Sequence, residues 1–202
     1  RAYTELLGVP VDMNQIFSTI YNNALTGDAD CGGLMAYNYF SGEPITGLQE
    51  GRPLFVRTVG NRFNLANFMR ANINAAVACL KIGNDILFNE EKIKVDRITG
   101  HGGLFKTPGV GQRILAAALN SPISVMETAG EGGAWGMALL AGFLVNNTND
   151  RNLADYLEME VFGGNTGTSI APTEEEVAGF NAYIENYKAC LPIEEAAVAH
   201  KK

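Results

Sequence analysis

Apolar residues recur every three or four positions from Asn64 to Ile82. This spacing predicts a helix with one buried face, because a helical turn of 3.6 residues brings such positions onto one side. Arg70 is the one cation in the middle of the stripe, which consists of Leu65, Phe68, Met69, Ile73, Ala76, Val77 and Leu80. We interpret the stripe as core and not as a cofactor contact.

A second helix is predicted near the carboxyl terminus. Thr173 and Glu176 have the spacing of a capping box, in which each side chain bonds the backbone N–H of the other residue. The helix is expected to end near Cys190, before Pro192. It carries a largely aromatic stripe of Val177, Phe180, Tyr183, Ile184 and Tyr187. A stripe of this kind must cover a neighbouring layer.

The middle of the chain predicts two successive strand–loop–helix units. Alternating polar and apolar residues from Lys92 to Thr99 predict a strand, glycine-rich residues 100–103 follow, and Ile114–Leu119 has a helical pattern. The same order of strand, glycine-rich loop and apolar helix is repeated over residues 123–126, 127–133 and 134–145. This order is typical of an α/β layer with parallel strands.

The last of these helices is rich in small residues, namely Gly136, Ala138, Ala141 and Gly142. Small residues permit close approach of the backbone to a sheet or to a neighbouring helix. We therefore expect this helix to lie inside the fold.

Other segments are predicted to be connections. The polar stretch from Ile20 to Gly33 contains turn-forming residues. Phe162–Ser169 is glycine-rich but lacks a lysine at the spacing of a phosphate-binding loop, so we expect a mobile surface loop there. The aromatic residues Tyr37, Tyr39 and Phe40 are open to two interpretations, the wall of a sugar cleft or a packed insertion.

Composition narrows the class of protein. The 202 residues are 47% hydrophobic and 18% charged, which indicates a globular domain and argues against disorder. The longest apolar run, residues 135–145, is shorter than the roughly 20 residues of a membrane span, and no signal-peptide pattern is found. The net charge of −7 argues against a nucleic-acid partner. We expect no membrane partner and a cytoplasmic location.

Three cysteines, Cys31, Cys79 and Cys190, are widely spaced and odd in number. They lack the spacing of metal ligands or of a disulfide framework. We expect free thiols in a reducing compartment.

The glycines after the first central strand are the main candidates for chemistry. Gly100, Gly102 and Gly103 leave the backbone bare, so that a nucleotide can touch peptide groups directly. An ordinary strand-to-helix turn explains the same pattern. His101 is open to interpretation as a phosphate contact or as a loop residue that orients its own backbone. No acid or nucleophile lies near it in the sequence to complete a catalytic set.

Four motifs together resemble the carboxy-terminal half of the FGGY carbohydrate kinases, which include xylulokinase and ribulokinase and belong to the actin-like ATPase superfamily. In the family's order, they are Tyr37–Pro44, Asn67–Ala71, Gly102–Pro108 with Gln112 and Leu115–Ala116, and Glu131–Ala141. The first is similar to the family's Pro-Tyr-x-Ser-Gly-Glu-Arg segment, the third to its adenosine motif, and the fourth to its closing helix. The ordered set is more specific than any one motif.

The resemblance implies an α/β fold of the ribonuclease-H-like (actin-like ATPase) type, as the carboxy-terminal half of a two-domain sugar kinase. It implies that Gly102, Gly103 and Leu104 lie along the adenosine and α-phosphate of ATP, and that Thr107 gives a hydroxyl contact. The implied activity is transfer of the γ-phosphate of ATP to a ketose or polyol hydroxyl. The implied ligands are ATP or ADP, the sugar and Mg²⁺.

The resemblance also divides the chain. We expect residues 1–145 to form the kinase domain, with an insertion near residues 31–57. The turn cluster Asn146–Asp150 marks the boundary, and residues 146–202 are expected to form a helical extension packed on that domain.

The chain departs from the family pattern in two segments. The Pro-Tyr segment lacks its proline and its arginine, with Pro44 directly after Glu43. Phe55–Val59 stands where relatives often carry Phe-Gly-Leu. These changes suggest a divergent branch that is nearer to xylulokinase and ribulokinase than to glycerol kinase.

Several parts of such a kinase are not found in the sequence, namely an Asp-Gly-Thr phosphate loop, a catalytic aspartate and a second Gly-Thr phosphate turn. We assign no catalytic residue and no metal ligand, and expect an amino-terminal kinase domain outside this chain to hold most of the magnesium site. We therefore expect a fragment that is catalytically silent alone and that associates with itself or with a partner. The alternative is a non-catalytic actin-like binding or assembly module, in which the glycines serve only packing.

Overall fold

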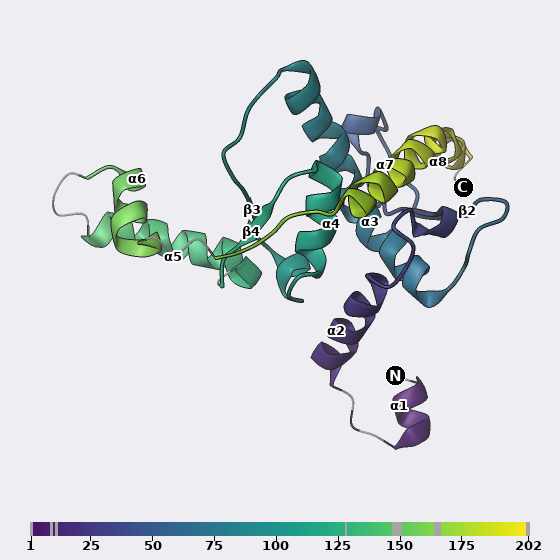
Figure 1. Cartoon of the computed structure of the whole chain (residues 1–202), viewed down its shortest axis with the longest axis horizontal. Coiled ribbons are helices and arrows are strands. Elements are labelled where there is room, and N and C mark those ends of the chain that lie inside the picture. The colour runs from purple at the N-terminus through teal and green to yellow at the C-terminus, as the bar shows by residue number, and fades with distance from the viewer. Residues whose placement is uncertain are drawn as a thin grey trace.

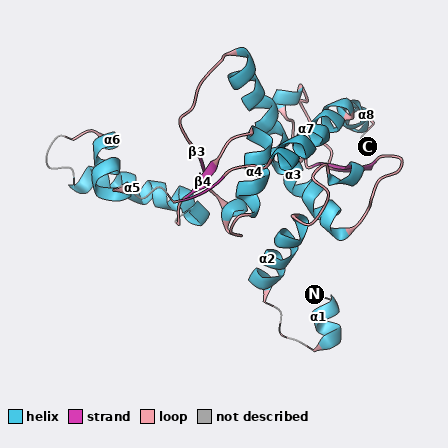
Figure 2. Cartoon of the chain, in the orientation of Figure 1, coloured by secondary structure: helices cyan, strands magenta, loops and turns pink. Residues whose placement is uncertain are grey.

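The computed structural model describes residues 2–8, 10, 12–127, 129–146, 151–163 and 167–200. The α-helices are α1 Ala2–Leu7, α2 Met13–Ala24, α3 Leu65–Asp85, α4 Val110–Leu119, α5 Gly132–Asn146, α6 Leu153–Tyr156, α7 Glu174–Ala189 and α8 Leu191–Ala199 (Figure 1). The strands are β1 Leu34–Tyr37, β2 Leu54–Arg57, β3 Ile98–Gly100, β4 Ile123–Val125 and β5 Thr168–Ile170. Helices dominate the molecule and the strands are short (Figure 2).

Strands β3, β4 and β5 form one sheet in that order. β4 pairs in parallel with β3 and antiparallel with β5, so that Ile98, Ile123 and Ile170 are neighbours in register. The parallel pairing confirms the prediction of an α/β layer built from strand–loop–helix units. β1 and β2, which lie in the predicted insertion near residues 31–57, pair antiparallel in a separate two-stranded sheet.

Helix α3 is the centre of the core and packs against α2, α4 and β1. Its first turn is capped by Asn64, whose side chain accepts a hydrogen bond from the backbone N–H of Asn67. The predicted helix is thus confirmed, and its buried apolar residues include Ala71, Ile73, Val77 and Ala78. The prediction that the whole stripe is core is wrong for Leu65, Ala76 and Leu80, which are exposed. Arg70 is buried in the same helix and donates from Nη1 to the carbonyl of Gly27 at 2.9 Å, which fixes the loop after α2.

Helix α7 buries its aromatic stripe, as predicted. Thr173 and Glu176 form the capping box, and the helix ends at Ala189, next to the predicted end at Cys190. The buried side chains are Phe180, Tyr183, Ile184 and Tyr187. The helix α8, which was not predicted, begins immediately afterwards with proline in its first turn.

Tyrosine hydroxyls join α7 to β1. Tyr187 donates to the hydroxyl of Tyr39 at 2.8 Å, and Tyr37 donates to the carbonyl of Tyr187 at 2.6 Å. Burial raises the pKa of Tyr39 to about 12, so its hydroxyl stays neutral at physiological pH. Tyr37 and Tyr39 are packed in the core, and the sugar-cleft interpretation is wrong for both. Phe40 differs, because it is 87% exposed.

Two predicted element boundaries are wrong. Residues 92–97 are not part of a strand, since β4 offers β3 only three residues for pairing. Residues 20–24, predicted to be a connection, are the last turns of α2. This helix begins after Asp12, whose side chain accepts from the backbone N–H groups of Asn14 and Gln15.

The predicted loop Phe162–Ser169 is also wrong in part. Thr168 and Ser169 belong to β5, where they pair with Val125 and Ser124. Residues 164–166 of this prediction, and residues 147–150 of the predicted turn cluster, lie outside the described residues.

The expectation that the small-residue helix lies inside the fold is wrong. α5 extends away from the body of the molecule (Figure 1), and it has no buried residue among those described. Its exposed apolar side chains are Trp135, Met137, Leu140, Leu144 and Val145. α6 contacts one side of it through the rings of Phe143 and Tyr156, whose centroids are 5.3 Å apart. Small residues permit close packing, but this helix has little described surface to pack against.

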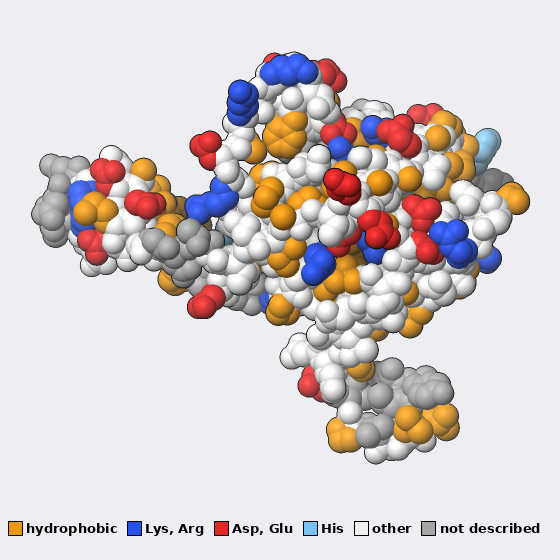
Figure 3. Space-filling model, in the orientation of Figure 1, with side chains coloured by type: hydrophobic (Ala, Val, Ile, Leu, Met, Phe, Trp, Pro, Cys, Tyr) orange, Lys and Arg blue, Asp and Glu red, His pale blue; other side chains and the backbone are white. Residues whose placement is uncertain are grey.

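The cysteine thiols, the surface charges and the length of the helices were also subjects of prediction. Cys31, Cys79 and Cys190 are free, as expected. On the face drawn in Figure 3, Lys and Arg side chains are interspersed with Asp and Glu. Among the described helices, none combines the length and the apolar character that a membrane span requires.

The side chain of Gln112 ties α4 to the sheet. Its Nε2 donates to the carbonyl of Ile123 in β4 at 3.1 Å and to the carbonyl of Thr168 in β5 at 3.0 Å. The residue is buried, so one amide satisfies two carbonyls from different strands at the point where β5 joins the sheet.

We expect Gln112→Leu to lower the free energy of unfolding by about 1–3 kcal/mol, because it keeps the volume of the side chain but removes the donor to the buried carbonyl of Ile123 and to the partly buried carbonyl of Thr168. Urea unfolding measures this change. Gln49→Leu, at an exposed position, is the matched control and is expected to change stability by less than about 0.5 kcal/mol. Equal effects of the two variants would contradict the proposed tie.

We expect Thr173→Ala to lower the free energy of unfolding by about 1 kcal/mol, since it removes the side-chain acceptor at the N-terminus of α7. Thermal and urea unfolding measure the loss. Thr173→Ser keeps the hydroxyl and should retain most of the stability, whereas a serine variant as unstable as the alanine variant would show that the methyl group matters more than the cap.

Candidate functional site

The two glycine-rich loops meet beside the carboxyl ends of β3 and β4. Parallel strands bring their carboxyl ends to one edge of a sheet, and this edge is where α/β folds place ligands. A backbone hydrogen bond joins the loops directly, because Gly102 donates to the carbonyl of Ala129 at 2.7 Å. The first loop then turns through Gly103–Phe105 before α4 begins.

Several glycines here are explained by packing alone. A Cβ on Gly100 would collide with the ring of Phe105, and one on Gly130 would lie 3.1 Å from Cγ of Lys106. A Cβ on Gly132 would lie 3.0 Å from the Cβ atom of His101. Gly130 and Gly132 thus allow the two loops to approach each other closely, and Gly100 leaves room for a ring of its own turn, which agrees with the packing interpretation of these glycines.

Gly102 and Gly103 have a different environment. A Cβ on either residue would meet no heavy atom within 4 Å. Gly102 has φ of 107°, a conformation that requires glycine. No positive φ is found at Gly103. Neither packing nor backbone strain therefore explains the bare backbone of Gly103, which faces open space.

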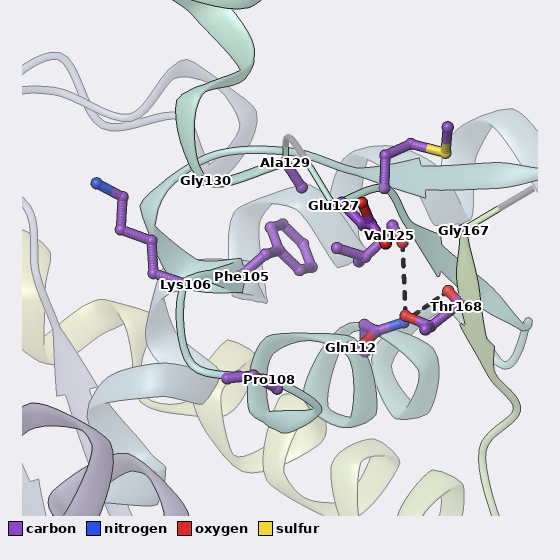
Figure 4. Close-up of a pocket in the computed structure, with 11 residues that line it drawn as sticks. Phe105, Lys106, Pro108, Gln112, Val125, Glu127, Ala129, Gly130, Gly167 and Thr168 are labelled. Atoms are coloured by element: carbon purple, nitrogen blue, oxygen red, sulfur yellow. Dashed lines mark hydrogen bonds between the residues drawn. The ribbon is translucent and has the colours of Figure 1, made fainter. Parts of the chain in front are cut away.

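The larger of two cavities at these loops has a volume of about 740 Å³. Both loops and β5 line it, through Phe105, Lys106, Pro108, Gln112, Val125, Met126, Glu127, Ala129, Gly130, Gly167 and Thr168. In Figure 4 the ring of Phe105 points inward, whereas the Lys106 side chain extends outward to the opposite side of the turn. The hydrogen bond from Gln112 to Thr168 closes the floor of this cavity.

The second cavity, of about 450 Å³, lies on the other side of the turn, against α2. Its walls are Gly103, Lys106 and Thr107 from the turn and Asn14, Phe17, Ser18 and Tyr21 from α2. Thr107 is only 7% exposed, yet its hydroxyl makes no hydrogen bond to another described residue. An unpaired hydroxyl in a nearly buried position is a group that a ligand can satisfy.

The structure brings together two of the four residues predicted to bind nucleotide. Gly103 and Thr107 share the second cavity. Gly102 holds the loop pair together and lines neither cavity. Leu104 also lines neither, and packs against α4, where a Cβ on Gly111 would lie 2.9 Å from its Cγ. His101 is exposed beside Gly132, which favours its interpretation as a loop residue.

Sequence reasoning missed the residues of α2 at this site. Its helical signal was present, because Asp12 is a capping residue and Ile16, Phe17, Ile20 and Tyr21 follow at spacings of three and four. The approach of α2 to the turn arises only in the tertiary structure. Within the described residues, no group of three or more His, Cys, Asp or Glu side chains is placed to hold a metal ion.

Solved structures with a similar fold are sugar kinases. Xylulose kinase from Rhodospirillum rubrum superposes with a TM-score of 0.61 at 18% identity, covering 91% of this chain and 35% of that chain. Ligand-bound xylulose kinase from Lactobacillus acidophilus has a TM-score of 0.63 at 22% identity, over 90% of this chain and 34% of the kinase. Plasmodium falciparum glycerol kinase with ADP has a TM-score of 0.62 at 14% identity, over 96% of this chain and 36% of the kinase. The chain thus spans about a third of the length of these kinases.

Comparison with curated proteins gave no significant match. The model of the FGGY family of carbohydrate kinases, C-terminal domain, matches residues 8–145. Together with the structural similarity, this match confirms the predicted actin-like ATPase (ribonuclease-H-like) fold. The chain belongs to the FGGY family of carbohydrate kinases, of which it carries the C-terminal domain.

Proposed function

We propose that this chain is the ATP-side domain of a sugar kinase that transfers the γ-phosphate of ATP to a ketose or polyol hydroxyl. The observation that carries the proposal is the pairing of Gly103 with Thr107 at one cavity. Gly103 leaves its backbone open where packing does not demand it, and Thr107 holds an unpaired hydroxyl that is nearly buried. The family match disfavours the alternative of a non-catalytic module.

The part of the chain in the reaction is to bind and orient the nucleotide. Phosphoryl transfer depends on positioning and on electrostatic stabilisation of the transferred group. Gly103 would supply a backbone contact along the adenosine and α-phosphate, and Thr107 a hydroxyl. Gly102 and Leu104, which line neither cavity, would hold the turn that carries them. A domain of this kind closes against the rest of the kinase and excludes water before transfer.

Kinases of this family use a divalent metal with ATP. We propose Mg²⁺, whose chemistry would be to neutralise charge on the phosphates. The described residues offer no cluster of acidic and histidine ligands for it. We therefore assign it mainly to residues outside this chain and derive no step through it.

Two further proposals concern the chain as a whole. We propose the cytoplasm as its location, because the proposed reaction consumes ATP. We also keep the division into a domain of residues 1–145 and an extension of residues 146–202 as a proposal.

We expect Gly103→Val to weaken binding of ATP at least about tenfold while the domain stays folded. The branched side chain would enter the space beside Thr107, and neither a steric clash nor a positive φ opposes it in the unliganded domain. Isothermal titration with ATP and a thermal melt of the same sample measure the two quantities separately.

Two glycines serve as matched controls. Gly100→Val should unfold or destabilise the domain, because its side chain would overlap the ring of Phe105. Gly83→Val in α3, whose Cβ would meet only Ile45 at 3.8 Å, should change neither ATP binding nor folding much. Loss of stability in Gly103→Val with unchanged ATP affinity of the folded fraction would overturn the assignment.

We also propose that the chain associates with a second copy or with the amino-terminal kinase domain. The exposed apolar side chains of α5 and the outer edge of β3, which pairs with no other described strand, favour association. Light scattering across a concentration series is expected to show a mass that rises with concentration. A strictly monomeric mass with a cooperative melt would contradict self-association.

A further inference from the structure

A third cavity, of about 450 Å³, lies between the loop that follows α2, the helix α3 and the start of α7. Its walls are residues 25–29, Arg70, Thr173, Glu175 and Glu176, and they are almost entirely polar. None of these residues lines either cavity at the glycine loops. Three segments distant in the sequence thus bring polar groups together at a place separate from the proposed nucleotide site.

Arg70 is a buried cation of this cavity that has no counter-ion. It is 5% exposed, and its Nη1 donates to the carbonyl of Gly27 at 2.9 Å. Its Nε is buried and makes no hydrogen bond to a described residue. No carboxylate in the described part of the chain forms an ion pair with the guanidinium. Burial of an unpaired charge is costly, so an anion that reaches this guanidinium is stabilised by it.

The next turn of α3 does not supply the missing negative charge. Asn74, four residues after Arg70, is fully buried, and its Oδ1 also lacks a hydrogen bond to any described residue. Side chains four residues apart lie on the same face of a helix, but an amide oxygen carries no net charge. The charge of Arg70 is therefore left to a ligand in the cavity.

Two of the three carboxylates at the cavity are already paired with arginines outside it. Asp28 forms an ion pair with Arg62 at 2.8 Å, and Glu176 forms one with Arg113 at 3.4 Å. Glu175 is exposed and forms no hydrogen bond or ion pair with a described side chain. Because water surrounds this carboxylate, its repulsion of an anion in the cavity is weak.

The N-terminus of α7 adds donors of its own. The first N–H groups of a helix have no acceptor within the helix, and the helix dipole favours negative charge at this end. Thr173 and Glu176 use the capping box to satisfy the N–H of Glu176. The N–H of Glu175, which lines the cavity, has no acceptor among the described residues. A helix N-terminus beside a buried guanidinium is an arrangement that suits an oxyanion.

We propose that this cavity is a second ligand site, which binds a phosphate group or a similar small oxyanion through Arg70 and the N-terminus of α7. One oxyanion offers acceptors to the Nε of Arg70 and to a backbone N–H at the same time. The site does not depend on the nucleotide, since the two share no residue. A ligand there would join α3, α7 and the loop after α2.

The test is isothermal titration of the 202-residue chain with inorganic phosphate. We expect saturable binding that weakens as salt is added. Arg70→Gln removes the charge and is expected to weaken binding roughly tenfold or more, because hydrogen bonds to charged groups are the stronger kind. Since Arg70 is buried, a thermal melt of the same sample establishes that the variant is folded.

Glu175→Gln tests the same site from an exposed position. It removes the unpaired carboxylate at the cavity and is expected to tighten phosphate binding roughly two- to fivefold. Glu195→Gln in α8, also exposed and outside the cavity, makes the same change in net charge and serves as the matched control. It should leave the affinity nearly unchanged.

Three results would overturn the proposal. They are a chain that does not bind phosphate, a folded Arg70→Gln variant with unchanged affinity, and equal affinities of the Glu175→Gln and Glu195→Gln variants. The last comparison decides the question if Arg70→Gln fails to fold. The proposed function stands in each case, because ATP binding is measured separately.

Glycerol 2-phosphate, titrated separately, distinguishes free phosphate from a phosphate ester. A cavity of about 450 Å³ is larger than a phosphate ion, so it has room for the rest of an ester. Tighter binding of the ester than of inorganic phosphate would assign the site to a phosphorylated small molecule. Tighter binding of inorganic phosphate would assign it to the free ion, and binding of neither would overturn the site.

Discussion

Close approach of two loop backbones is the constraint on which the site depends. The hydrogen bond between Gly102 and Ala129 joins two loops that approach each other where side chains are absent at Gly130 and Gly132. Gly130 leaves room for Lys106, and Gly132 leaves room for His101. Bulkier residues at these positions would push the loops apart, and the turn that carries Gly103 and Thr107 would lose one of its supports.

The turn needs a rigid base, and the base comes from segments distant in the sequence. Gln112 holds α4 to β4 and β5, and α4 itself packs against α3 and α7. Tyr187 fixes α7 to β1 and to the residues after it, because its carbonyl accepts from the hydroxyl of Tyr37 and its own hydroxyl donates to that of Tyr39. Because these contacts are buried, the orientation of α4 and of the turn before it is determined by the core.

The sequence predicted what depends on local periodicity. α3 and α7 were found because their apolar residues repeat at helical spacing, and the cap of α7 at Thr173 was also explicit in the sequence. β1 was missed because it is buried along its whole length and shows no alternation. The environment predicted for α5 was wrong, and the contribution of α2 to the cavity was missed, for the same reason. Both depend on which surfaces meet in three dimensions, and no local pattern contains that information.

The glycines of the site differ in why they lack a side chain: some are needed for packing, whereas Gly103 is open to a ligand. Where a glycine touches the other loop or its own turn, as at Gly100, the missing side chain stabilises the fold itself. At Gly103 the neighbouring residues already hold the backbone. On one side Gly102 is hydrogen-bonded to Ala129, and on the other side Leu104 packs against Gly111. A backbone that is fixed on both sides and open in the middle loses little conformational freedom when a ligand binds, which favours affinity. The unpaired hydroxyl of Thr107 gives that ligand a polar partner at the same place.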